Sequence, residues 1–150
     1  MHRTTMKAGL SMPVIVELRR LLERAREILI ERHTEPTEAG VMGLGILYGL
    51  FLLLPFDSFT SPVFRVLLSV APEAVWGCLS LGYGLAMLVG IAGYSEWLRS
   101  NAVFAASGHW LFVATSAFLG SPLTPAWVVY SAVAGASIWA FIRVQRRQRE

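Results

Sequence analysis

Charge and cysteine are both scarce in this chain of 150 residues. Charged side chains make up 15% of the sequence, whereas a soluble globular domain carries about 25%. The single cysteine, Cys78, excludes an intramolecular disulfide, and we expect it to pack as a small buried thiol. These shortages exclude a secreted disulfide scaffold and disfavour a soluble enzyme or a nucleic-acid-binding module. We therefore expect no catalytic residue, no cofactor, no metal site and no nucleic-acid partner.

The charges that remain leave long stretches of the chain uncharged. With His109 and Cys78 set aside, no acidic or basic side chain of Asp, Glu, Lys, Arg or His occurs in runs of 18 residues (39–56), 22 residues (74–95) and 43 residues (100–142). A membrane-spanning helix needs about 20 apolar residues, so these runs hold one, one and two spans. The sequence predicts an all-α fold, an integral membrane four-helix bundle. We expect a transmembrane domain over 36–144, with spans at about 38–56, 73–97, 101–119 and 125–143.

The basic residues indicate how this bundle is oriented. Of the 13 Lys and Arg residues, seven precede the first span and four follow the last. The positive-inside rule then places both termini in the cytoplasm, including the basic tail 145–150. Two ends on one side require an even number of spans, which agrees with four. The lipid bilayer is thus the first expected partner.

The segment before the first span has a strong helical pattern. We expect a flexible N-terminus (1–12) and then an amphipathic cytoplasmic or interfacial helix (13–35). Its apolar residues recur at intervals of three and four, which is typical of a coiled-coil seam and favours docking on a protein. A helix lying in the inner membrane interface is the other interpretation, but its polar face is usually dominated by Lys and Arg, whereas this one is mixed. The docking residues would be Ile15, Leu18, Leu22 and Leu29.

Small residues in the first and last spans are candidates for close helix packing. Gly45 and Gly49 form a GxxxG pair, and Ser131 and Gly135 lie four apart in the last span. Small side chains let helix backbones approach closely in lipid. Packing within one chain explains most such positions, and self-association into a homo-oligomer is the further prediction.

Few polar side chains in the apolar runs and their connections could carry a function. His109 is the only strongly polar residue deep in a predicted span, and intramembrane ionisable groups are functional candidates. A neutral histidine bonded to Ser107, Thr115 or a backbone carbonyl is the alternative. In the outer connection, we expect a local cluster of charges formed by Asp57, Arg65 and Glu73.

The outer connection also carries a family resemblance. The stretch LPFDSF at 54–59, with SPVFR at 61–65 and APEAVWG at 71–77, resembles small four-span membrane proteins encoded by tailed phages and prophages. An Arg-rich amphipathic start and an Arg-rich tail are also typical of that group. The resemblance implies a phage or prophage setting in the bacterial inner membrane, and it transfers no catalytic residue.

Two functions follow from these patterns. The leading one is self-association in the inner membrane with holin-like or depolarising pore formation. The alternative is a membrane anchor or accessory that recruits a cytoplasmic protein partner through its N-terminal helix, as in superinfection exclusion or virion assembly. Scarcity of polar residues in the spans disfavours a constitutive wide pore, whereas the small-residue faces favour assembly.

Overall fold

The structure is a computed structural model, and the part of the chain that it describes forms most of one compact unit. Met1–His33 and Thr34–Glu150 are separate units, so the second is described by itself. The predicted N-terminus (1–12) and amphipathic helix (13–35) lie outside the described residues, apart from two positions. The described residues are Val16, Arg20, 36–55, Phe59 and 61–148.

Four long helices make up the second unit. They are α2 (Pro36–Leu53), α4 (Glu73–Ala92), α5 (Glu96–Gly120) and α6 (Ala126–Arg147). A short 3₁₀ turn, η2 (Pro62–Phe64), and the short helix α3 (Arg65–Val70) connect α2 to α4. The described residues contain no strand, and each long helix is long and apolar enough to cross a membrane. The prediction of an all-α, multi-pass membrane protein with four spanning helices is confirmed in these terms.

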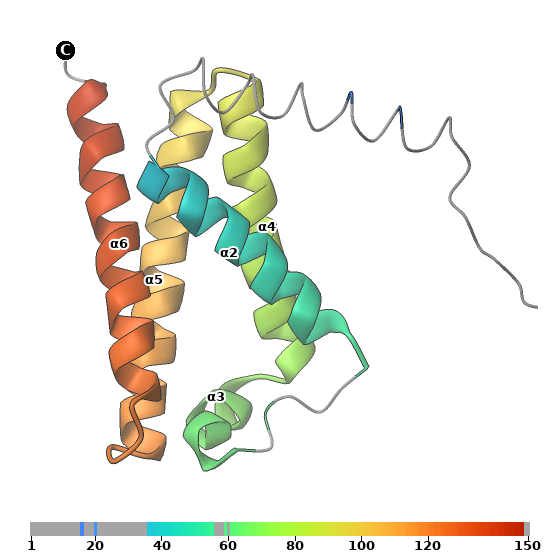
Figure 1. Cartoon of the computed structure of the whole chain (residues 1–150), viewed down its shortest axis with the longest axis vertical. Helices are drawn as coiled ribbons and strands as arrows, with labels where there is room; N and C mark the ends of the chain where they lie inside the picture. The colour runs from blue at the N-terminus through green and yellow to red at the C-terminus, as the bar shows by residue number, and fades with distance from the viewer. Residues whose placement is uncertain (1–15, 17–19, 21–35, 56–58, 60, 149–150) are drawn as a thin grey trace, which may run out of the picture. The chain divides into compact units, whose positions relative to one another are not determined.

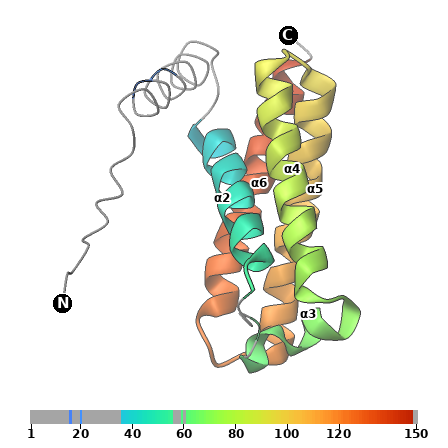
Figure 2. The same cartoon turned by 90° about the vertical axis from the view of Figure 1, so that its right-hand side faces the viewer.

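Successive long helices run in opposite directions (Figures 1 and 2). The start of α2, the α4–α5 turn and the last turns of α6 therefore lie at one end of the bundle, which we call the terminal end. The α3 helix and the α5–α6 connection lie at the opposite end, where α3 contacts α5. Both ends of the four-helix unit thus emerge on the same side, as an even number of spans requires.

The four helices pack as two antiparallel pairs that meet through α4 and α5. The most extensive contacts are those of α5 with α6 and of α2 with α4. The interior is filled by fully buried apolar side chains, among them Met87, Val103 and Trp110 on the long helices and Leu67 on α3. Lipid is as apolar as this core, so burial of apolar surface cannot determine which helices pack together. Close packing must determine it instead.

The helix boundaries differ from the predicted spans where capping and charge intervene. The apolar run predicts a second span that continues to residue 97, but α4 ends at Ala92 and Tyr94 adopts a left-handed φ of 55°. The hydroxyl of Ser95 then accepts a hydrogen bond from the Leu98 N–H at 3.3 Å, so α5 begins at Glu96 rather than near 101. At its other end, α6 continues through the arginines to Arg147, because a helix can extend beyond its apolar stretch.

Candidate functional sites in the bundle

A buried cluster of charged side chains lies at the terminal end. The guanidinium of Arg99 donates to both carboxylate oxygens of Glu38, from Nε at 2.9 Å and from Nη2 at 2.8 Å. Its Nη1 donates to Oε1 of Glu96 at 2.7 Å. The side chains of Glu38 and Arg99 are 1% and 8% exposed, whereas that of Glu96 is 47% exposed. This bidentate geometry is the strongest form of an Arg–carboxylate pair.

Local structure on α2, α4 and α5 brings these charges together. Pro36 begins α2, which suits the first helical turn, and Glu38 follows in that same turn. The Ser95 cap sets the start of α5, and Arg99 follows in its first turn. On α4, Gly90 leaves room for the arginine: a Cβ there would lie 2.8 Å from Cγ of Arg99. The cluster therefore depends on three of the four long helices.

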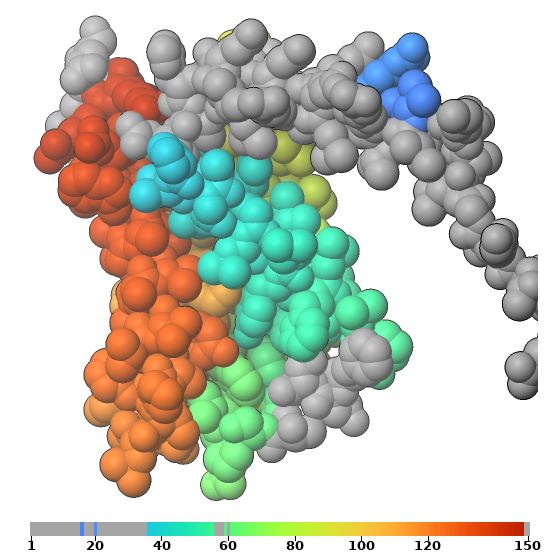
Figure 3. Space-filling view, in the orientation of Figure 1, coloured from blue at the N-terminus to red at the C-terminus, as the bar shows by residue number. Residues whose placement is uncertain are grey.

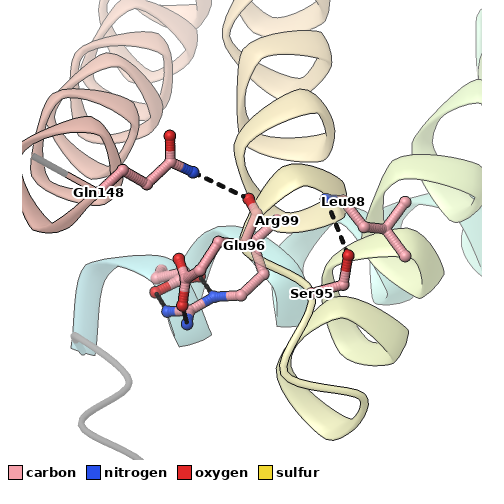
Figure 4. A network of polar contacts seen from close by, with 6 residues as sticks. Ser95, Glu96, Leu98, Arg99 and Gln148 are labelled. Carbon is pink, nitrogen blue, oxygen red and sulfur yellow. Dashed lines mark hydrogen bonds and ion pairs between the residues drawn. The ribbon is translucent and has the colours of Figure 1, made fainter.

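The fourth helix joins the same polar region through two glutamines. Gln145 on α6 donates its amide N–H to the Ser100 hydroxyl at 2.6 Å. Gln148, just after α6, donates to the backbone carbonyl of Glu96 at 3.2 Å (Figure 4). Figure 4 shows this second bond beside the Ser95 cap and the Arg99 ion pairs. All four helices are thus linked at the terminal end.

Sequence reasoning did not find the Glu38–Arg99 pair, because 61 positions separate the two residues. In the sequence, Arg99 is visible only as a basic residue between the second and third predicted spans. The available signal is topological: each residue lies at the start of an odd-numbered span, so both lie at the same end of the bundle. A lone buried charge would be costly, which makes opposite charges at one end natural partners.

His109 lies inside the bundle and pairs with a different helix from the one expected. Its Nε2 is 3.0 Å from the hydroxyl oxygen of Ser80 on α4. The two suggested partners bond within their own helix instead, since Ser107 donates to the Val103 carbonyl and Thr115 to the Leu111 carbonyl. The hydrogen bond therefore crosses between α4 and α5 in the interior of the unit.

Aromatic rings from all four long helices meet around His109 and its neighbour Trp110. His109 lies 5.5 Å from the Tyr83 ring and 5.4 Å from the Trp110 ring, centroid to centroid. Trp110 in turn contacts Tyr48 of α2 at 5.1 Å and Tyr130 of α6 at 6.0 Å. The sequence pattern does not indicate this convergence, because the four helices contribute the rings at unrelated positions.

The small residues predicted for helix packing fall into two different environments. Gly45 and Gly49 face α4 inside one chain: a Cβ on Gly45 would meet the Tyr83 ring, and one on Gly49 would lie 2.5 Å from the Leu81 nitrogen. Gly135 has no heavy atom within 4 Å of the corresponding position, and Ser131 is exposed. The structure thus places the first two in an intrachain contact and leaves the α6 positions on the outer surface.

The single cysteine differs from its predicted setting, and the predicted outer charge cluster is described only in part. No ion pair joins Arg65 to Glu73 among the described residues, and Asp57 lies outside them. Arg65 is exposed at the start of α3, while Glu73 is partly buried at the start of α4. Cys78 is predicted to be buried, but it is exposed on the outer face of α4. An apolar environment outside the bundle accommodates such a side chain as well as a core does.

No metal-binding site is apparent in the described part of the chain. Within it, no group of three or more His, Cys, Asp or Glu side chains is arranged to hold a metal ion. Some polar groups form ion pairs or hydrogen bonds between helices, and others bond to a carbonyl within their own helix. The chain matches no protein-family model, no curated protein and no solved structure. The class defined by the fold is therefore a multi-pass helical membrane protein.

Proposed function

We propose that this protein is a self-associating anchor or adapter of phage type in the bacterial inner membrane, with both termini in the cytoplasm. One observation carries the preference for an anchor over a wide pore. In the four spanning helices, every charged side chain lies near a helix end, and the outward faces between those ends are almost entirely apolar. Water-filled pores are lined by polar groups or charges, and apolar constrictions exclude water.

The outer face of α6 supports self-association. This helix is the least buried of the four, and its exposed side carries Ser131, Ala132 and Gly135. In the space-filling view, α6 touches α2 near the start of α2 and forms one side of the unit (Figure 3). Between the two helices lies a groove of about 380 Å³, lined on α6 by small and β-branched residues. A helix from a second copy could approach closely here.

Gly135→Leu is expected to reduce self-association. The new side chain enters open space on the lipid-facing side of α6, so it blocks close approach of a second helix without disturbing the folded chain. We expect the oligomer fraction, measured by chemical crosslinking in native membranes, to fall by about half or more. Gly82→Leu is the matched control, because Gly82 on α4 is equally open. Equal crosslinking of parent and Gly135→Leu would contradict assembly through α6.

The proposed partner-recruiting element is the amphipathic segment 13–35, nearly all of which lies outside the described residues. Its apolar stripe would dock a cytoplasmic protein or a second copy, and the start of α2 and the end of α6 share the terminal end of the bundle. The pore hypothesis assigns this segment to assembly of a lesion instead. The two functions therefore differ in what expression of the protein does to the membrane potential.

Expression of the parent chain is expected to leave the membrane potential intact, as a voltage-sensitive dye would report. Leu18→Glu with Leu22→Glu places two carboxylates in the apolar stripe, where burial of an unpaired charge costs several kcal/mol. We expect this double variant to insert normally and to lose a co-purifying partner. Glu23→Gln with Glu27→Gln, which changes only the polar side, is the control. A parent that collapses the potential, with collapse abolished in the double variant, would favour the pore instead.

A further inference from the structure

A groove on the outer surface between α4 and α5 leads to His109, which is partly buried. Its volume is about 430 Å³, and its lining includes Trp76, Tyr83, Gly108, His109 and Phe112. Such a volume is within the range of small-molecule sites, about 300–1,000 Å³. Phe112 and Leu79 on its rim are 38% and 52% exposed, so the groove opens towards the lipid rather than towards either end of the bundle.

The walls of this groove suit a flat ring. Trp76 and Phe112 stack on each other with centroids 5.3 Å apart and an interplanar angle of 18°. On α5, Ala105 and Gly108 line the groove on the same helix as Phe112, and no heavy atom lies within 4 Å of the place that a Cβ on Gly108 would occupy. Aromatic walls beside small residues leave a slot in which a planar apolar molecule could stack.

Polar atoms at the inner wall give the slot a specific chemistry. The His109 ring has one hydrogen bond among the described residues, from Nε2 to Ser80, which leaves Nδ1 available. In one tautomer Nδ1 donates to a carbonyl, and in the other it accepts from a hydroxyl. Beside it, Tyr83 is 5% exposed, and its ring packs against Gly45 of α2. His109 is therefore the polar group that a molecule in the groove would meet.

We propose that this groove binds the ring of an isoprenoid quinone or its quinol from the bilayer. A quinone combines the three properties that the groove selects: a flat ring for the Trp76–Phe112 wall, a ring oxygen for His109, and an apolar tail that remains in lipid. The reduced and oxidised forms offer a hydroxyl and a carbonyl, which match the two tautomers of the histidine. A plain acyl chain would fill the volume but would leave Nδ1 of His109 without a partner.

The test is binding of a short-tailed ubiquinone to the full chain in phosphatidylcholine nanodiscs, followed by quenching of tryptophan fluorescence. We expect saturable quenching by the parent. Gly108→Leu fills the slot from its open side and should weaken binding at least about tenfold, whereas the control Gly82→Leu lies on α4 outside the groove and should not. His109→Phe keeps an aromatic ring but loses the bond to Ser80 and the proposed bond to the quinone. Only the second is a contact with the ligand, so binding should weaken about two- to tenfold.

Three results would overturn the proposal. The first is quenching that rises linearly with quinone and never saturates, which indicates partition into lipid alone. The second is equal affinity of the parent and Gly108→Leu, which places binding elsewhere. The third is competition by farnesol, a tail without a ring, as effective as that by the quinone, since the groove would then hold only an apolar chain. Circular dichroism of each variant shows whether the helices are retained.

Discussion

Arg99→Ala is expected to cause the largest loss of stability of any single substitution in the described bundle. The change leaves the carboxylate of Glu38, which is 1% exposed, without its bidentate partner. Removing one member of a buried ion pair costs about 3–5 kcal/mol, because the remaining charge is left uncompensated. Unfolding in mixed micelles by titration with sodium dodecyl sulfate, followed by circular dichroism, measures the free energy directly.

Two control variants separate the buried pair from charge in general. Glu96, the outer partner of Arg99, has a side chain that is 47% exposed. Glu96→Gln should therefore lower the free energy of unfolding by less than about 1 kcal/mol. The double variant Glu38→Leu with Arg99→Met replaces both buried charges by apolar groups and should recover most of the stability lost by Arg99→Ala. If Arg99→Ala unfolds at the same detergent fraction as the parent, the pair does not hold α2 against α5.

Gly49→Ala is expected to destabilise the contact between α2 and α4. The added Cβ would lie 2.5 Å from the backbone nitrogen of Leu81 and 2.9 Å from the Gly77 carbonyl oxygen. Neither atom can move without shifting α4, so the helices must separate. Overpacking of this kind costs about 1–3 kcal/mol. The same detergent titration measures the effect.

Gly43→Ala on the same helix is the matched control. A Cβ at this position would have no heavy atom within 4 Å, and alanine favours a helix over glycine by up to about 1 kcal/mol. We therefore expect a neutral or stabilising effect. At Gly45 the new Cβ meets the ring of Tyr83, a side chain rather than backbone, so the loss should be smaller than at Gly49. A parent-like Gly49→Ala would show that α2 and α4 are not packed this closely.

The spans were predictable because the length of the charge-free apolar runs decides them. The charge-free runs are long enough for four helices, and Pro36, Pro72 and Pro125 punctuate them. Boundaries were less predictable where a local bond competes with hydropathy. The Ser95 cap starts α5 several residues earlier than apolar content alone suggests, because it satisfies a backbone N–H that would otherwise lack a partner.

The candidate sites were predictable one residue at a time but not as sets. His109 stands out in the sequence as an isolated polar group within a span, yet its partner Ser80 lies 29 positions away on another helix. Glu38 and Arg99 are each visible as charges beside apolar runs. Their pairing needs the relative rotation of α2 and α5 about their own axes, which no local pattern specifies.

The sequence by itself determined that the described chain forms four helices able to span a membrane, and its arginine distribution predicts their orientation. The tertiary structure decided which faces meet: Gly49 against α4, Arg99 against Glu38, and His109 against Ser80. In a soluble protein, an apolar stripe indicates which side of a helix is buried. Here lipid and core are equally apolar, so the stripe carries little information. Close packing at small residues and a few interhelical polar bonds select the arrangement instead.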